Sequence, residues 1–182
     1  IEPLASFSDG RTFRIYVRLK KGLSEQEEKQ MGFLARCEKC GAQDAQTLLK
    51  FTGWKNCPCS CGSKSLSING PLWLGALQSA HFLTKTKRLY QESSLPIFET
   101  SAKLIDRLMV DIGLPLFSWS PNDLAKLFSL EFPPSLEFLV NSLRAEGYQA
   151  YRSAIVPGHF RTNAAVGELL RICQGKFIKG FK

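Results

Sequence analysis

Five cysteines crowd into one short window, and no other feature of the sequence restricts the fold as strongly. Residues 37–62 read CEKCGAQDAQTLLKFTGWKNCPCSCG and hold five of the six cysteines among the 182 residues. Cys37-x2-Cys40 has the spacing of half a zinc knuckle, because two thiolates two residues apart can chelate one ion from a tight turn. Gly41 lets that turn close. Sixteen residues separate this pair from Cys57, within the range of a four-cysteine zinc site.

The second half of this site holds one cysteine more than a tetrahedral ion needs. The run CPCSCG supplies Cys57, Cys59 and Cys61, and Cys61 followed by glycine has the form of a knuckle's end. The partner of Cys61 is either Cys57, through a three-residue spacer, or Cys59, through a single residue. We favour Cys57, because a one-residue spacer holds two thiolates awkwardly on one ion. The predicted metal ligands are Cys37, Cys40, Cys57 and Cys61, with Cys59 as the alternative to Cys57.

A closed four-thiolate site predicts structural Zn²⁺, because no position stays open for a catalytic water. The alternative is a group of buried or oxidisable thiols without metal. The N-terminus lacks the features of a signal peptide and reads like a cut inside a longer protein. No apolar run reaches transmembrane length. We therefore expect an intracellular, reducing location, in nucleus, cytoplasm or organelle, with no membrane partner.

The charge of the chain points to an acidic partner. The formal net charge is +8, which favours nucleic acid first and an anionic membrane second. The alternative is a basic surface with no partner. The sequence does not indicate an oligomeric state.

Hydrophobic spacing changes from period two to helical after the cysteines. Residues 13–20 alternate, which predicts a strand with one apolar face and one basic, solvated face. Helices are predicted over 76–91, 101–112, 120–128 and 135–147, followed by a hairpin over 148–162 and a last helix. The predicted fold class is α+β, with a small cysteine-rich zinc ribbon followed by a helical, loosely winged-helix-like domain.

The segment INGPLWLGAL, directly after the cysteines, is similar to the Gly-Pro-x-Trp-x-Gly-x-Leu signature of tRNA (guanine-26-N2)-dimethyltransferases. Four other segments resemble that family in the same order, and together they span nearly the whole chain. Two positions depart from its pattern: Ala154 stands where histidine is common, and Arg161 where lysine is common. The four segments are FRIYVRLKKG, SPNDLAKLF, PPSLEFLVNSLRAEGY and YRSAIVPGHFRTNAA.

The resemblance implies the C-terminal zinc and tRNA-binding part of an S-adenosylmethionine-dependent dimethyltransferase, which positions tRNA for methylation of a guanine exocyclic N2. The sequence has neither a Gly-rich loop nor an Asp-Pro-Phe-Gly-type element. We therefore expect no catalytic residue here, S-adenosylmethionine in a missing upstream domain, and an inactive chain on its own. The implied parts are residues 1–30 (end of the catalytic domain and a connecting loop), 31–75 (zinc ribbon with GPLWLG) and 76–182 (helical tRNA-binding domain with hairpin and basic tail).

Two other functions compete with this interpretation. A non-enzymatic zinc-ribbon and winged-helix DNA-binding module explains the charge and the cysteines equally well, but not GPLWLG. A protein-interaction module would make the basic surface incidental.

The resemblance also implies contacts from lysine and arginine to tRNA, because A-form helices are recognised mostly by shape and backbone. The alternative is that these side chains belong to ordinary solvated faces of strands and helices. For Lys176 and Lys179, the alternative is a mobile C-terminal tail. The predicted RNA-binding residues are Arg14, Arg18, Lys20, Arg152, His159, Arg161, Thr162, Lys176 and Lys179.

Overall fold

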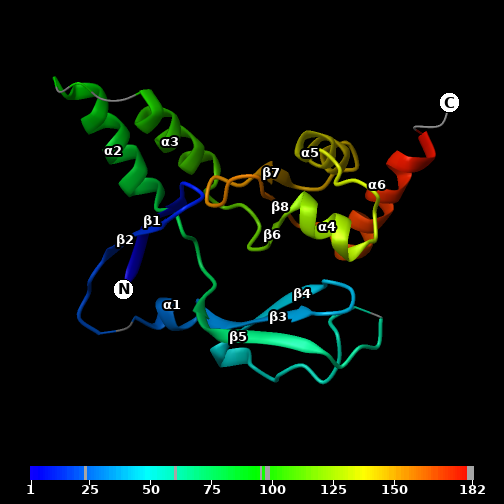
Figure 1. Cartoon of the computed structure of the whole chain (residues 1–182). Coiled ribbons are helices and arrows are strands. Elements are labelled where there is room, and N and C mark those ends of the chain that lie inside the picture. The colour runs from blue at the N-terminus through cyan, green and yellow to red at the C-terminus, as the bar shows by residue number, and fades with distance from the viewer. Residues whose placement is uncertain (23, 60, 95, 97–98, 180–182) are drawn as a thin grey trace.

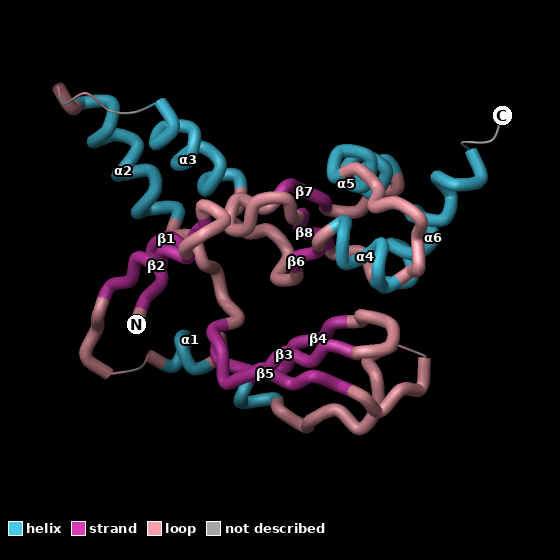
Figure 2. The backbone as a smooth tube through the Cα atoms, viewed as in Figure 1, coloured by secondary structure: helices cyan, strands magenta, loops and turns pink. Residues whose placement is uncertain are grey.

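The computed structural model describes residues 1–22, 24–59, 61–94, 96 and 99–179, with residues 176–179 described by backbone alone. The strands form three small antiparallel sheets, which stand apart in Figure 2. The first is a hairpin of β1 (Glu2–Ser8) and β2 (Phe13–Arg18). In the second, β3 (Met31–Cys37) lies between β4 (Gln43–Thr47) and β5 (Leu66–Trp73). In the third, β8 (Phe160–Thr162) lies between β6 (Ser118–Trp119) and β7 (Ala150–Arg152).

The helices begin where serine side chains can cap them. Ser79, Ser120 and Ser135 each accept a hydrogen bond from the amide three residues on, and Pro121 occupies the first position of its helix. None of the described helices combines the length and apolar composition of a membrane-spanning segment. The helices are α1 (Glu25–Glu28), α2 (Ala80–Glu92), α3 (Glu99–Val110), α4 (Pro121–Leu127), α5 (Leu136–Ala145) and α6 (Val166–Lys179), with a 3₁₀ turn, η1 (Leu48–Lys50).

The main core joins α4, α5 and α6 to the third sheet, at the right of Figure 1. Leu139 and Leu143 lie four residues apart, so they point from one face of α5 into this core. Leu124, Leu169 and Phe160 meet them from α4, α6 and β8, and all five side chains are fully buried. The helical periodicity therefore predicted the core side of α5 correctly.

A second core builds the N-terminal hairpin into the helical region. Ala5 of β1 packs with Leu83 of α2 and Leu108 of α3. The buried Gln78 side chain accepts a hydrogen bond from the backbone amide of Ser6 at 3.2 Å and donates one to the backbone carbonyl of Ser6 at 2.6 Å. This core corrects the predicted fold class, because a zinc ribbon followed by a winged-helix-like domain leaves no place for β1 among the helices.

The burial predicted for β2 is wrong. Its alternating pattern does form a strand, but the apolar side chains lie in solvent: Phe13 is 71% exposed and Ile15 is 68% exposed. The reason is that β1 covers β2 along its edge, while no described element covers its apolar face. The division of the chain into parts at residues 30 and 75 stays a prediction.

Candidate functional site

Two tight turns bring the cysteines together at one end of the β3–β4–β5 sheet. The first turn follows β3: the amide of Gly41 donates to the Cys37 carbonyl at 2.9 Å. Gly41 has a φ of 72°, which favours glycine, and a Cβ there would lie 2.4 Å from a methyl carbon of Leu127. In the second turn, the amide of Cys57 donates to the Ser63 carbonyl at 2.8 Å. Both turns therefore aim their thiols into one small space.

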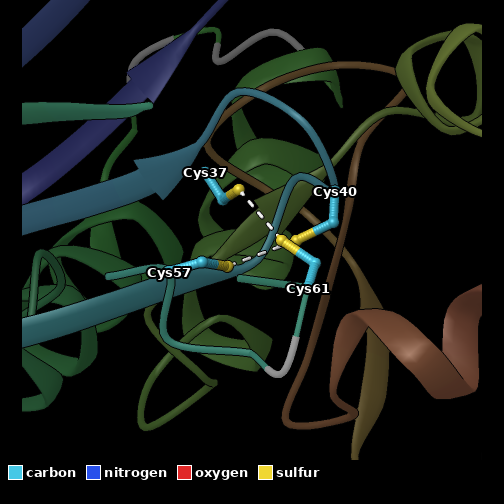
Figure 3. A group of neighbouring side chains, drawn as sticks. All are labelled: Cys37, Cys40, Cys57 and Cys61. Atoms are coloured by element: carbon cyan, nitrogen blue, oxygen red, sulfur yellow. Dashed lines mark hydrogen bonds between the residues drawn. The ribbon is translucent and has the colours of Figure 1, made fainter. Parts of the chain in front are cut away.

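The sulfur positions suit one tetrahedral ion. The Sγ atoms of Cys37, Cys40, Cys57 and Cys61 all lie within 4.8 Å of one another. Cys37 and Cys61 are 3.7 Å apart, and Cys40 and Cys57 are 3.5 Å apart (Figure 3). Zinc–sulfur bonds of about 2.3 Å place tetrahedral sulfurs about 3.8 Å apart. These two separations lie close to that edge length and the remaining pairs lie within 4.8 Å, so the donor set fits zinc in chemistry and in approximate size.

Cys59 lies in the same cluster, but at shorter separations. Its Sγ is 3.0 Å from that of Cys40 and 3.1 Å from that of Cys57. Both distances are well below the edge of a zinc-centred tetrahedron, about 3.8 Å. The separation from Cys40 is nearer to that edge for Cys57, at 3.5 Å, than for Cys59, at 3.0 Å, so it favours Cys57. The choice between the two cysteines stays a prediction.

Burial disfavours the anionic form of two of these thiols, Cys40 and Cys57. It raises the pKa of Cys40 to about 12, and it also raises the pKa of Cys57. Burial also opposes ionisation of Cys37, but the amides of Cys40 and Lys39 and the Cys57 thiol lower its pKa to about 6. A divalent cation would offset the charge that four buried thiolates bring together.

The cysteine cluster packs directly against the helical region. Its buried members touch Val166 at the start of α6, and Gly41 touches Leu127 of α4. Cys40, Cys59 and Cys61 line one hollow together with residues of α4 and α6. A metal held here would fix the two turns whose outer surface packs against these two helices.

The family-like motif GPLWLG forms the end of β5 and the turn after it. Gly70 has a φ of 152°, and a Cβ there would lie 2.5 Å from the Phe33 ring of the neighbouring strand. Trp73 donates from its indole Nε1 to the Ala76 carbonyl at 3.1 Å. Gly70 and Trp73 thus serve the close packing of the sheet and the chain's exit toward α2.

The basic residues of β2 and of the segment just after it point into solvent, but acidic neighbours face them. Arg18 and Lys20 lie 3.2 Å and 2.9 Å from the same carboxylate oxygen of Glu2. Arg14 lies 3.8 Å from Asp9. These exposed pairs are weak, so the three cations stay accessible to another anion.

Arg161 and Thr162 lie inside the protein. Arg161 Nη1 is 2.6 Å from Asp111 Oδ2, and both side chains are almost fully buried. Its Nε and Nη2 donate to the carbonyls of Pro115 and Leu114. Burial raises the pKa of Asp111, against the opposing effect of the Arg161 charge. Arg161 thus holds β8 to the end of α3, and its guanidinium already has partners within the protein.

The other predicted RNA-binding residues differ in their accessibility. Arg152 is exposed and lies 3.9 Å from the carboxylate of Glu137. His159 is half-buried, with Nδ1 3.1 Å from the hydroxyl of Ser118. The side chains of Lys176 and Lys179 lie outside the described residues. The RNA-binding role of all nine residues stays a prediction.

Sequence reasoning missed the buried Asp111–Arg161 pair and two exposed arginines near Arg152. Those two, Arg107 of α3 and Arg144 of α5, line one hollow with Arg152 of β7. Arg107 lies on α3, far from α5 and β7 in the sequence, and the strand differs in periodicity from the two helices, so no spacing pattern grouped the three arginines.

Comparisons with known proteins place most of the chain in one family. The family model for N2,N2-dimethylguanosine tRNA methyltransferase matches residues 1–174. A tRNA (guanine(26)-N(2))-dimethyltransferase from Methanobrevibacter smithii is 27% identical over 96% of this chain and 45% of the relative. The protein of that name from Archaeoglobus fulgidus is 29% identical over 97% of this chain and 47% of the relative.

The fold is similar to that of a solved structure. That structure is Trm1 from Pyrococcus horikoshii in complex with S-adenosyl-L-methionine, with a TM-score of 0.69 at 20% sequence identity. The match covers 94% of this chain and 43% of that chain. The chain thus spans a little under half the length of these relatives, and its fold is that of the matching part of Trm1.

These matches overturn two of the predictions. The chain aligns as one piece with Trm1, so the predicted fold class of a zinc ribbon plus a winged-helix-like domain is wrong. The match to the methyltransferase family model covers residues 1–174 of this chain, so the prediction of a C-terminal zinc and tRNA-binding part, separate from the methyltransferase domain, is wrong as well. The DNA-binding alternative is not favoured, since the relatives named above are tRNA methyltransferases.

The family resemblance itself is confirmed: the chain belongs to the N2,N2-dimethylguanosine tRNA methyltransferase family.

Proposed function

We propose that the protein carrying this chain transfers methyl groups from S-adenosylmethionine to the exocyclic N2 of guanine 26 in tRNA. The observation that carries this proposal is the family match over residues 1–174. The relatives are named for guanine 26, which supports that target nucleotide, and the complex of Trm1 with S-adenosyl-L-methionine supports that methyl donor. The activity belongs to the whole protein, because the chain spans only 43–47% of the relatives described above.

The charge of the chain is consistent with tRNA as the partner. A net charge of +8 attracts a polyanion by releasing its condensed counterions. The exposed cations Arg14, Arg18 and Lys20 are held only by weak surface ion pairs. A phosphate group can therefore replace their carboxylate partners at little cost.

The proposal includes a structural Zn²⁺ held by Cys37, Cys40, Cys57 and Cys61. Support comes from four convergent sulfurs at separations near a tetrahedral edge and from the burial of two of them. Zinc would offset part of the negative charge of the four thiolates and fix the two turns, and four protein ligands leave no position for a reacting water. The metal is therefore proposed to stabilise the protein and to take no part in methyl transfer.

The proposal is tested by a methylation assay with the full-length protein. Radiolabelled S-adenosylmethionine is incubated with a tRNA transcript that carries guanine 26 and with a matched transcript that carries adenine there. We expect label in the first transcript alone, recovered as N2-methylated guanosine after digestion. Equal labelling of both transcripts, or none in either, would contradict the proposed target.

The same assay with residues 1–182 alone tests whether they suffice. We expect no transfer, because the relatives are about twice as long as this chain. Methylation by the 182 residues at the full-length rate would show that the remainder of the protein is dispensable for chemistry.

A further inference from the structure

A hollow of about 350 Å³ opens between the end of α3, one face of α5 and β7. Figure 1 places β7 beside α5, close to where α3 ends. The hollow is lined by three arginines, each from a different element: Arg107, Arg144 and Arg152. Pockets of this size commonly receive small ligands or single groups of larger ones.

The hollow carries a positive charge that its own residues do not cancel. Glu137 is the acidic residue in its lining, and it lies 3.9 Å from Arg152. Both side chains of that pair are more than half exposed, so the pair is weak. Among the described residues, no carboxylate is recorded within ion-pair distance of Arg107 or Arg144. The lining is therefore complementary to an anion.

One of the three arginines is fixed in place. Arg144 donates from Nε to the Ala150 carbonyl at 2.6 Å, and its guanidinium carbon lies 4.6 Å from the centre of the Tyr151 ring. These two contacts orient the guanidinium plane in advance and leave its terminal nitrogens as donors. A flat, pre-oriented guanidinium can stack on a base or pair with phosphate oxygens.

Two polar side chains beside the arginines offer further hydrogen bonds. Ser153 Oγ accepts from the amides of Ile155 and Val156, so its hydroxyl hydrogen remains available to a ligand. Asn141 lies in the lining on the exposed side of α5, and its amide can pair with a base edge. Cations, a stacking plane and neutral donors together match a nucleotide better than a simple anion.

We propose that this hollow binds one nucleotide of the tRNA backbone, with Arg107 and Arg152 at its phosphates and Arg144 with Tyr151 as the stacking surface. The proposal rests on the proposed function for the identity of the RNA. It adds a contact site, made of three arginines, to the interface of the enzyme with its substrate. The hollow then positions the tRNA and has no part in the chemistry.

The test is tRNA binding by the full-length protein across a salt series, with variants Arg107→Ala and Lys103→Ala. Lys103 is the matched control: it lies one turn away on α3, is exposed, pairs with Glu99 and does not line the hollow. We expect Arg107→Ala to weaken binding on the order of tenfold and to lower the salt slope by about one. Lys103→Ala should change neither quantity by a comparable amount.

Two further variants separate stacking and charge. Arg144→Lys keeps the charge but loses the flat guanidinium, so affinity should fall while the salt slope stays unchanged. Glu137→Gln frees Arg152 from its carboxylate partner, so affinity should rise. Thermal unfolding of each variant checks that the fold is intact.

Each outcome bears on the proposal. Equal losses for Arg107→Ala and Lys103→Ala would mean that only the overall charge matters, and would overturn it. Unchanged binding in Arg107→Ala and Arg144→Lys, by a protein that still methylates guanine 26, would overturn it and leave the proposed function standing. Absence of methylation in the unaltered protein would instead refute the proposed function.

Discussion

At the scale of single residues, the cysteine cluster presents five thiols for four metal positions. The spacer argument and the sulfur separations agree in leaving Cys59 out. Its Sγ lies 3.0 Å from that of Cys40, closer than two sulfurs on one zinc ion, which lie about 3.8 Å apart. Cys59 is then a spare thiol beside a closed site.

This assignment predicts different metal contents for two neighbouring variants. Cys57→Ser should lose most of its zinc, because a serine hydroxyl is a far weaker zinc ligand than a thiolate. Cys59→Ser should keep about one zinc per chain. Elemental analysis of the purified proteins measures both. Zinc retained in Cys57→Ser but lost from Cys59→Ser would make Cys59 the ligand.

The buried pair of Asp111 and Arg161 carries a second residue-scale prediction. Asp111→Ala removes the only ion-pair partner recorded for Arg161 among the described residues and leaves a buried, uncompensated charge. Such a loss costs about 3–5 kcal/mol in the free energy of unfolding. Urea unfolding followed by circular dichroism measures it.

A double variant is the control for this loss. Asp111→Leu combined with Arg161→Met leaves no unpaired charge and should recover most of the stability. A loss below about 1 kcal/mol in Asp111→Ala would mean that water or another group replaces the carboxylate.

At the scale of elements, the β1–β2 hairpin has an uneven distribution of burial. Ala5 of β1 is buried against α2 and α3, whereas Ile15 of β2 is 68% exposed. We expect Ile15→Ser to change the free energy of unfolding by no more than about 0.5 kcal/mol. Leu83→Ala, in the core that holds β1, should cost about 2–5 kcal/mol.

Chemical denaturation of both variants checks this contrast. A large loss in Ile15→Ser would mean that the apolar face of β2 is covered in solution. Sedimentation of the same samples would then show whether a second copy of the chain covers it.

The sequence predicted elements best where the local signals were strong. Ser120 followed by Pro121 marked the start of α4, and Leu139 and Leu143 marked the core side of α5. The sequence did not predict β1 as a strand, because its residues, EPLASFS, mix proline, alanine and serine without clear alternation of apolar and polar side chains. For β2 the alternation was read correctly as a strand, but burial depends on what packs against it, which no local pattern encodes.

For the candidate sites too, the sequence predicted what depends on local spacing and did not predict what depends on packing between elements. The thiols that come together lie within one window of the chain, and their spacing predicted the cluster. The hollow of Arg107, Arg144 and Arg152 is built from three separate elements, so only the folded chain reveals it.

At the scale of the whole molecule, the cysteine cluster is where the second sheet meets the helical region. Gly41 lies against Leu127 of α4, and the cluster touches Val166 of α6. The core that holds β1 lies with α2 and α3, apart from this contact (Figure 1). A change at the metal site should therefore reach α4 and α6 before it reaches α2 and α3.

Removal of zinc tests this arrangement. Treatment with a strong chelator should lower protection from hydrogen exchange in the turns around Cys37 and Cys57 and, to a smaller degree, in the packed ends of α4 and α6. The reason is that four buried thiols without a cation no longer hold the two turns together. Protection in α2 and α3 should stay unchanged, because their core of Leu83 and Leu108 has no contact with the cluster. Mass spectrometry of exchanged peptides resolves these segments, and equal loss of protection throughout the chain would mean that the metal supports the fold as a single unit.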